Sequence, residues 1–172
     1  MEAAGDVPEE DIKIREYPDP FLRNKSRPVK AITDEEVELF EKMTAIMRES
    51  NGIGLAAPQI GVLRQLIVAD AGKGLLMIAN PVILKAKGLD KLKEGCLSVP
   101  GVNIEVKRAS EIILEALDEK GRKIQIKAGG LMARILQHEV DHLKGKLIVD
   151  YISFWDKLKM FFRKKSATDN HG

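Results

Sequence analysis

Hydrophobic residues recur at helical spacing in two segments of the chain. In the first, residues 33–36 form a Thr-Asp-Glu-Glu capping box, and apolar side chains then follow three or four residues apart at Val37, Phe40, Met43 and Met47. We predict a helix over Thr33–Ser50, ended by the Asn-Gly pair at 51–52. A second helix is predicted over Leu131–Leu143, between a Gly-Gly pair at 129–130 and Gly145.

Between these helices the pattern changes to short segments that are rich in branched residues and often alternate between polar and apolar positions. The predicted strands are Gln65–Asp70, Leu75–Ala79, Val102–Lys107, Glu111–Asp118 and Arg122–Lys127. An Asp-Glu-Lys-Gly turn at 118–121 joins the last two as a hairpin. Because the connections are direct, we expect antiparallel pairing and an α+β fold. Antiparallel strands would pack around the second helix, with an N-terminal and a C-terminal helix beside them.

The C-terminal segment is basic. Ser153 and Asp156 form a capping pair, which predicts a helix over residues 153–166. Its basic residues are Lys157, Lys159, Arg163, Lys164 and Lys165. Such a segment is either a solvated end or a docking site for RNA or a membrane surface. We expect residues 1–16 to be partly flexible and residues 167–172 to form a flexible tail.

Composition narrows the class of protein. A chain of 172 residues with 44% hydrophobic and 31% charged residues predicts one globular domain over residues 1–172. A net charge of +2 is too small for a general nucleic-acid clamp, so we expect no DNA partner. The longest stretch without a charged residue, Ser50–Leu63, is too short to span a membrane. The acidic N-terminus lacks a targeting signal, and the single cysteine excludes an internal disulfide, so we expect a cytoplasmic protein.

The strongest chemical signal is a His-Glu-Val-Asp-His segment inside the second predicted helix. His138 and His142 are four residues apart, so their imidazoles project from one helix face and one metal ion can bridge them. Glu139 cannot point fully at the same ion, which suits a base that acts on metal-bound water. A pair of surface histidines without a metal is the structural alternative.

A catalytic metal needs a third protein ligand, and the usual peptidase ligands are missing. Where one class has a third histidine this chain has Ile148, and from Leu143 onward it has no glutamate. Cys96 is the upstream candidate, in a Gly-containing turn between strand-like segments. A buried cysteine without a role is its alternative. With Cys96, the two histidines would form a three-coordinate site whose fourth position holds water.

A third segment, GIGLAAPQ at residues 52–59, combines small residues with one amide, Gln59. Backbone at such a segment can approach a ligand closely, although a simple turn with a packing contact would have the same composition. It is not a dinucleotide-binding loop, because it follows a helix and Ala57 replaces the third glycine.

Together GIGLAAPQ (52–59), EGCLS (94–98) and QHEVDH (137–142) resemble the three motifs of the peptide deformylase family, in the same order and without a departure inside the motifs. The resemblance implies that Cys96, His138 and His142 hold the metal and that Glu139 is the acid/base. It also implies that Gln59 and the Leu97 backbone N–H stabilise the oxyanion.

The implied reaction is removal of the formyl group from the N-terminal formyl-methionine of nascent polypeptides, with release of formate. The implied native metal is Fe²⁺, with Zn²⁺, Ni²⁺ or Co²⁺ as substitutes, since His₂Cys ligation suits several ions. The C-terminal basic helix resembles that of bacterial-type members, which implies docking on the ribosome. One departure lies outside the motifs, because several relatives have Arg seven residues after the metal cysteine and this chain has Asn103.

Residues around the motifs are candidates for substrate binding. Leu131 and Ile135 lie seven and three residues before His138, on the same side of the helix, and with Ile53 they could form a pocket for the methionine side chain. Plain core packing is the alternative for each. Gly54 and Gly95 would leave room for the hydrogen of a formyl group but not for a methyl group. Two other functions remain open, a metal-dependent peptidase and a metal-free binding module.

Overall fold

The structure is a computed structural model, and it describes residues 13–152. Two α-helices, seven β-strands and short 3₁₀ turns make up this part of the chain. In order they are η2 (Pro20–Arg23), α1 (Asp34–Glu49), β1 (Gly54–Ala56), η3 (Ala57–Ile60), β2 (Leu66–Ala69), β3 (Leu76–Lys87), β4 (Asp90–Cys96), β5 (Val99–Arg108), β6 (Glu111–Asp118), β7 (Lys123–Gly129), α2 (Gly130–Leu143) and η4 (Ile148–Tyr151).

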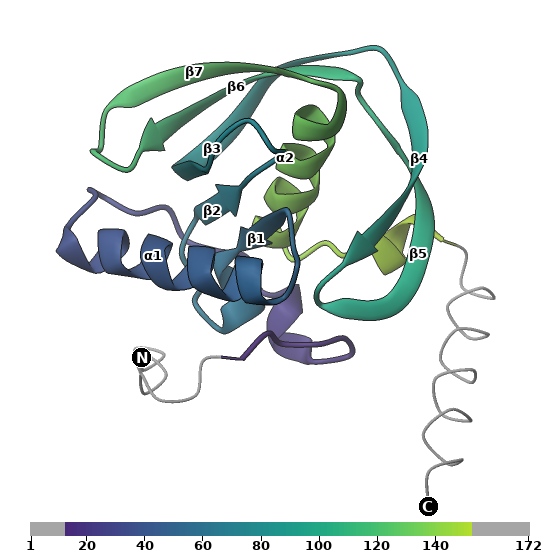
Figure 1. The fold of residues 1–172 in the computed structure, drawn as a ribbon, viewed down its shortest axis with the longest axis horizontal. Coiled ribbons are helices and arrows are strands. Elements are labelled where there is room, and N and C mark those ends of the chain that lie inside the picture. Colours follow the sequence, from purple (N-terminus) through teal and green to yellow (C-terminus); the bar gives the residue numbers. More distant parts are fainter. Residues whose placement is uncertain (1–12, 153–172) are drawn as a thin grey trace, which may run out of the picture.

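The strands form two antiparallel units with α2 between them. One is a five-stranded sheet in the order β1-β2-β3-β6-β7, and the other is a two-stranded ribbon of β4 and β5. Figure 1 shows α2 running through the middle of the molecule, with the large sheet on one side and the ribbon on the other. The predicted α+β class and the antiparallel packing around the second helix are therefore confirmed.

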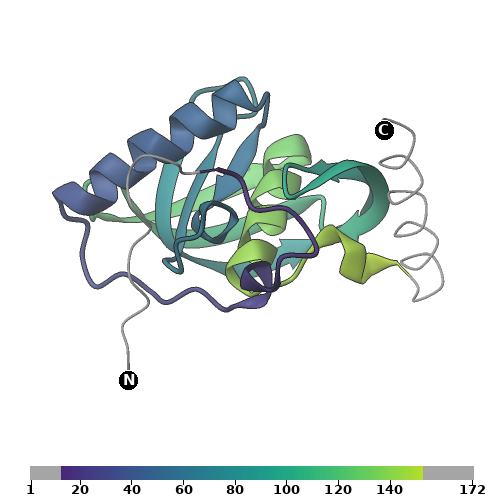
Figure 2. The ribbon, with the colours of Figure 1, turned by 90° about the horizontal axis from the view of Figure 1, so that it is seen from below.

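Two apolar clusters attach the helices to the large sheet. The first joins α2 to β6 and includes Ala133, Leu136, Val140, Ile112 and Leu114. The second joins α1 to the β1–β2 end of the sheet and includes Phe40, Met43, Met47, Leu55 and Val68. Figure 2 shows the two helices from below, on either side of β1 and β2. Burial of these side chains fixes the position of α2 and of the side chains that project from it.

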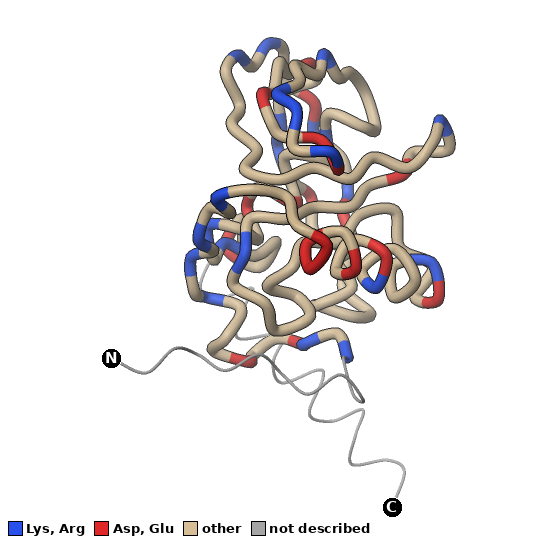
Figure 3. Tube along the Cα trace, turned by 90° about the vertical axis from the view of Figure 1, so that its left-hand side faces the viewer, with Lys and Arg blue, Asp and Glu red and all other residues tan. Residues whose placement is uncertain are grey.

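Local signals in the sequence correspond to real contacts. The Thr33 backbone N–H donates to Glu36 Oε2 at 2.9 Å, as the capping box requires. In the 118–121 turn, Asp118 Oδ1 accepts from the Lys120 and Arg122 backbone N–H groups at 2.9 and 2.8 Å. Basic and acidic residues are both spread over the trace (Figure 3). Within the described residues, no helix is both long enough and apolar enough to cross a membrane.

Some predicted boundaries were wrong. Strand β4 was not predicted, because Asp90–Lys93 are exposed on both faces and show no polar–apolar alternation. Strand β1 was missed because it has only three residues. The strand predicted at Leu75–Ala79 extends to Lys87 with register shifts on the way. The predicted C-terminal helix (153–166), the tail and residues 1–12 lie outside the described part of the chain.

Candidate metal centre and active-site cleft

Three side chains with metal-binding atoms converge where α2 meets the end of β4. Helix α2 places the Nε2 atoms of His138 and His142 3.1 Å apart, and Cys96 Sγ lies 3.3 Å from His142 Nε2. The three donor atoms all lie within 4.8 Å of one another. Cys96 is the last residue of β4 and pairs with Val99 across a tight turn. The structure thus brings together the three residues that the sequence named.

The chemistry of this donor set fits a divalent metal ion. A thiolate and two imidazoles are typical ligands of zinc and related ions, with bond lengths of about 2.0–2.3 Å that put donor atoms roughly 3.4–3.6 Å apart in a tetrahedron. The observed spacings of 3.1 and 3.3 Å are within a few tenths of an ångström of that range. Burial lowers the pKa of the His142 imidazole well below its ordinary value, whereas at His138 burial is outweighed by the bonds to Cys96 and Glu94, which raise the pKa to about 10.

Glu94 orients one of the ligands. Its Oε2 lies 3.0 Å from His138 Nδ1, which leaves Nε2 of that ring to face the other donors. The Glu94 carboxylate also accepts from Arg108 Nε at 2.7 Å and from Arg134 Nη1 at 2.6 Å. Burial alone would raise the pKa of Glu94, but the bonds from His138 and the two arginines lower it to about 2. Glu94 is therefore a buried carboxylate held in its ionised form.

The same network continues away from the metal centre. Arg108 Nη1 donates to Asp141 Oδ2 at 2.8 Å, and the Tyr151 hydroxyl donates to the same oxygen at 2.6 Å. Asp141 is on α2, Arg108 is at the end of β5, and Tyr151 is in η4. One chain of charged hydrogen bonds thus ties the ribbon, the central helix and the following turn together.

Glu139 is buried next to the ligand His138 and is 4% exposed. Within the described residues its Oε2 atom has no hydrogen-bond partner. Burial raises the pKa of this carboxyl to about 7, although His138 and Arg108 act in the opposite direction. Gly54 makes room for it, since a Cβ added there would lie 2.5 Å from Glu139 Oε1. A buried carboxylate with an unpartnered oxygen is an arrangement suited to proton transfer.

The amide of Gln59 is oriented by its own hydrogen bonds. Its Oε1 accepts from the Ala56 backbone N–H at 2.8 Å, and its Nε2 donates to Ser98 Oγ at 3.1 Å. Nε2 also lies 3.8 Å from Cys96 Sγ, which places it beside the candidate metal position. Gln59 and Leu97 both line the cavity described next. This position next to the metal centre is compatible with the oxyanion role that the sequence predicts for them.

A cavity of about 540 Å³ opens beside the metal centre. The five predicted substrate-binding residues all line it, together with Gln59, Cys96, His138 and Glu139. They are Ile53, Gly54, Gly95, Leu131 and Ile135. The side chains of Ile53 and Leu131 are about half exposed, whereas Ile135 is buried in the core beneath them. Ile53 and Leu131 therefore give the cavity an accessible apolar surface, as a site for an apolar side chain requires.

Sequence reasoning missed the supporting residues. Glu94, Arg108, Arg134 and Ser98 received no role, although Glu94 and Ser98 lie inside a quoted motif. Arg108 and Arg134 could have been suspected only from their positions, one at the end of a strand and the other on the apolar face of a helix. Their contacts to Glu94 cross 14 and 40 residues of sequence, and no local pattern encodes such a pairing.

Comparison with known proteins agrees with this geometry. The model of the family described as polypeptide deformylase matches residues 12–158. The chain is 43% identical over 143 residues to the peptide deformylase of Halothermothrix orenii, covering 82% of this chain and 93% of that one. It is 48% identical over 138 residues to the peptide deformylase of Carboxydothermus hydrogenoformans, covering 80% and 91%.

A solved structure shares the fold as well as the sequence. The crystal structure of a peptide deformylase from Legionella pneumophila superposes with a TM-score of 0.85 at 38% identity, covering 93% of this chain and 98% of that chain. The family match, the sequence identity and the shared fold all extend over most of the chain. This chain therefore belongs to the polypeptide deformylase family, metal-dependent hydrolases that remove the N-formyl group from nascent peptides.

Proposed function

We propose that Cys96, His138 and His142 hold a divalent cation, Fe²⁺ in the cell, and that Glu139 is the proton carrier for hydrolysis of formyl-methionyl peptides. The observation that carries this proposal is the convergence of three donor atoms within 4.8 Å at the end of an apolar cavity, beside a buried carboxylate without a partner. When bound, the cation would lower the pKa of a coordinated water and polarise the formyl carbonyl.

The chain's own residues would manage the proton and the negative charge. Glu139 accepts a proton from the attacking water and returns it to the nitrogen of the methionine as the C–N bond breaks. The products are formate and a free amino group. Gln59 Nε2 and the Leu97 backbone N–H would donate to the carbonyl oxygen as it becomes negative, and each such donor is worth about 3 kcal/mol in typical cases.

The cavity supports binding of a peptide end. Ile53, Leu131 and Ile135 provide apolar surface for the methionine side chain. In the described chain, strand β4 pairs only with β5, so no other strand covers its second edge, and its last residues line the cavity. An extended peptide can add to such an edge. The substrate would then enter with its formyl group at the metal and its chain along β4.

The test is formate release from a formyl-Met-peptide, run anaerobically with Fe²⁺, beside the matching acetyl-Met-peptide. Gly54 and Gly95 leave little space beyond the carbonyl carbon, and a methyl group would displace it by about 1 Å, which costs on the order of a hundredfold in rate. We expect kcat/KM for the formyl peptide to be at least about a hundredfold higher. Equal rates on both acyl groups, or cleavage of internal peptide bonds, would instead indicate a general metallopeptidase.

A further inference from the structure

The cavity beside the metal centre carries one exposed charge among the residues that the structure describes. Besides the candidate ligands Cys96 and His138, the ionisable side chains that line it are Lys93, Glu94, Arg134 and Glu139. Glu94 and Arg134 are buried and paired with each other, and Glu139 is buried beside the metal centre. Lys93, on β4, is exposed to solvent at the edge of the cavity.

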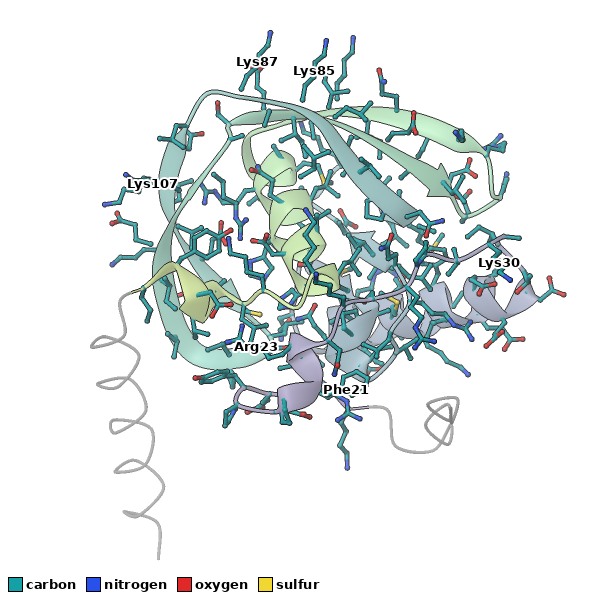
Figure 4. All side chains as sticks on the ribbon, turned by 180° about the vertical axis from the view of Figure 1, so that it is seen from behind. Phe21, Arg23, Lys30, Lys85, Lys87 and Lys107 are labelled. Carbon is teal, nitrogen blue, oxygen red and sulfur yellow. The ribbon has the colours of Figure 1, made fainter. Side chains whose placement is uncertain are left out.

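Lys93 has no ionic partner in the described part of the chain. Strand register places it opposite Glu105 of β5, but Glu105 forms its salt bridge with Lys91. Lys107 lies opposite Lys91 on the same face of the ribbon, and Figure 4 shows its side chain directed away from the molecule. The ammonium group of Lys93 is therefore free to meet a ligand at the cavity.

Asn103 makes Lys93 the dominant charge at this position. It lines the cavity, and its Oδ1 would lie 3.2 Å from a Cβ added at Gly95, so its side chain covers Gly95 on the face that also carries Lys93. Since the amide of Asn103 is neutral, it neither repels nor attracts a charged substrate side chain. Among the described side chains of this face that line the cavity, only Lys93 is charged.

The alternation of side chains in an extended peptide decides which substrate residue meets Lys93. The methionine side chain would point toward Leu131 and Ile135 of α2, the direction in which Glu94 also points to reach its partners on that helix. Lys93 and Gly95 alternate with Glu94 and lie on the opposite face. In an extended substrate, the residue after the methionine also points to the opposite face.

Distances along the strand are compatible with a contact between Lys93 and the residue after the methionine. Lys93 precedes Cys96 by three residues, which is about 10 Å along a strand. The Cα of the residue after the methionine lies about 6 Å beyond the formyl carbon in an extended chain. A lysine side chain is long enough to cover the difference. Building on the proposed function, we infer that Lys93 favours substrates with an acidic residue directly after the formyl-methionine.

Three peptides test this inference, formyl-Met-Glu-Ala, formyl-Met-Gln-Ala and formyl-Met-Lys-Ala, each with an amidated C-terminus so that only the second residue differs in charge. An exposed ion pair changes an equilibrium by about 1.4- to 5-fold, and repulsion of the lysine peptide adds to this. At low ionic strength we expect kcat/KM for the Glu peptide to exceed that for the Lys peptide by about 3- to 20-fold, through KM. The ratio should approach one at high salt.

Variants separate Lys93 from the general field of the protein. K93Q should remove the preference, and K93E should reverse it. K107Q is the matched control, because Lys107 is on the same face of the ribbon, points away from the molecule, does not line the cavity and leaves the Lys91–Glu105 pair intact. It should keep the wild-type preference.

The outcomes distinguish this inference from the function on which it rests. If the formyl-Met-Gln peptide releases no formate, the proposed function fails. If it does release formate but the wild-type protein treats the Glu and Lys peptides equally, the role of Lys93 is refuted while the function stands. A preference that survives in K93Q or disappears in K107Q would also refute it.

Discussion

The metal centre is built by two regions of opposite character. Helix α2 supplies His138, Glu139 and His142 from a face that is packed into the main core. The β4–β5 ribbon supplies Cys96 from a strand whose first four residues are exposed. In the proposed function, the buried helix provides two metal ligands and the proton carrier, whereas the exposed ribbon provides the third ligand and a strand edge for the peptide.

The two regions depend on each other through Glu94. This residue belongs to β4, yet its carboxylate contacts His138 and Arg134 on α2 as well as Arg108 on β5. Few apolar contacts hold β4 itself, so the buried ion network attaches this strand to the helix. Four predictions separate what the helix contributes from what the ribbon contributes.

The largest effect on turnover is expected on the helix side, at Glu139. Glu139→Gln keeps the volume of the side chain but removes the group that accepts and returns the proton. We expect formate release to fall by about 10²- to 10⁴-fold while metal content stays unchanged. Turnover assays with elemental analysis of the purified protein would measure both. Glu115→Gln, on strand β6 of the large sheet, does not line the cavity and is the matched control, which should keep full activity. Near-normal turnover by a metal-loaded Glu139→Gln protein would contradict the proton-carrier role.

On the ribbon side, Cys96→Ser should affect the metal rather than the chemistry. A serine hydroxyl stays protonated at neutral pH, and two histidines alone form a weak site. We expect metal affinity to fall by more than the roughly 10- to 100-fold that loss of an outer partner costs. Titration of the metal-free protein with Co²⁺ or Zn²⁺ would measure the change. Ser98→Ala should retain the metal, because that hydroxyl contacts Gln59. Unchanged affinity in Cys96→Ser would remove Cys96 from the ligand set.

Glu94→Gln tests the connection between the two regions. The amide cannot neutralise Arg108 and Arg134, which are both buried. We expect metal affinity to fall by about 10- to 100-fold, and the free energy of unfolding to fall by about 3–5 kcal/mol because buried charges lose their partner. Metal titration well below the melting temperature and urea unfolding would measure the two effects separately. Glu111→Gln, at an exposed position of β6, should change neither quantity. Normal metal affinity with reduced stability would limit Glu94 to a structural role.

The contrast between the buried helix α2 and the exposed strand β4 also explains which parts of the site could be predicted from the sequence. The sequence predicted that His138, Glu139 and His142 lie on one helix, and α2 does carry them, because helix geometry converts a spacing of four residues into one face. Cys96 was proposed because the chemistry of the site needs a third ligand, and its thiol does lie beside the two imidazoles, although its strand was missed. Strand β4 has no polar–apolar alternation, since it is exposed on both faces until Glu94. Periodicity therefore carries no signal there.

The ion network could not be predicted for a different reason. Arg108 reaches Glu94 across the ribbon, Arg134 reaches it from α2, and Tyr151 closes the network through Asp141. Each of these contacts follows from the packing of separate elements against one another. A charged residue near a motif indicates that it has a partner, but the sequence does not show which one.

The smallest effect on activity is expected from substitutions that test the difference in packing between α2 and β4. Leu136 of α2 is fully buried, whereas Leu92 of β4 is 56% exposed. Leu136→Ala should lower the free energy of unfolding by about 2–5 kcal/mol, because it leaves a cavity in the core around the helix. Leu92→Ala should change it by less than about 0.5 kcal/mol, because solvent already surrounds that side chain. Both variants should keep the ligands and Glu139 in place, so formate release at low temperature should remain near the wild-type rate. Urea unfolding of the two variants, at matched metal loading, measures the difference. Equal losses at the two sites would show that Leu92 is covered in solution and that the ribbon is not the exposed region described above.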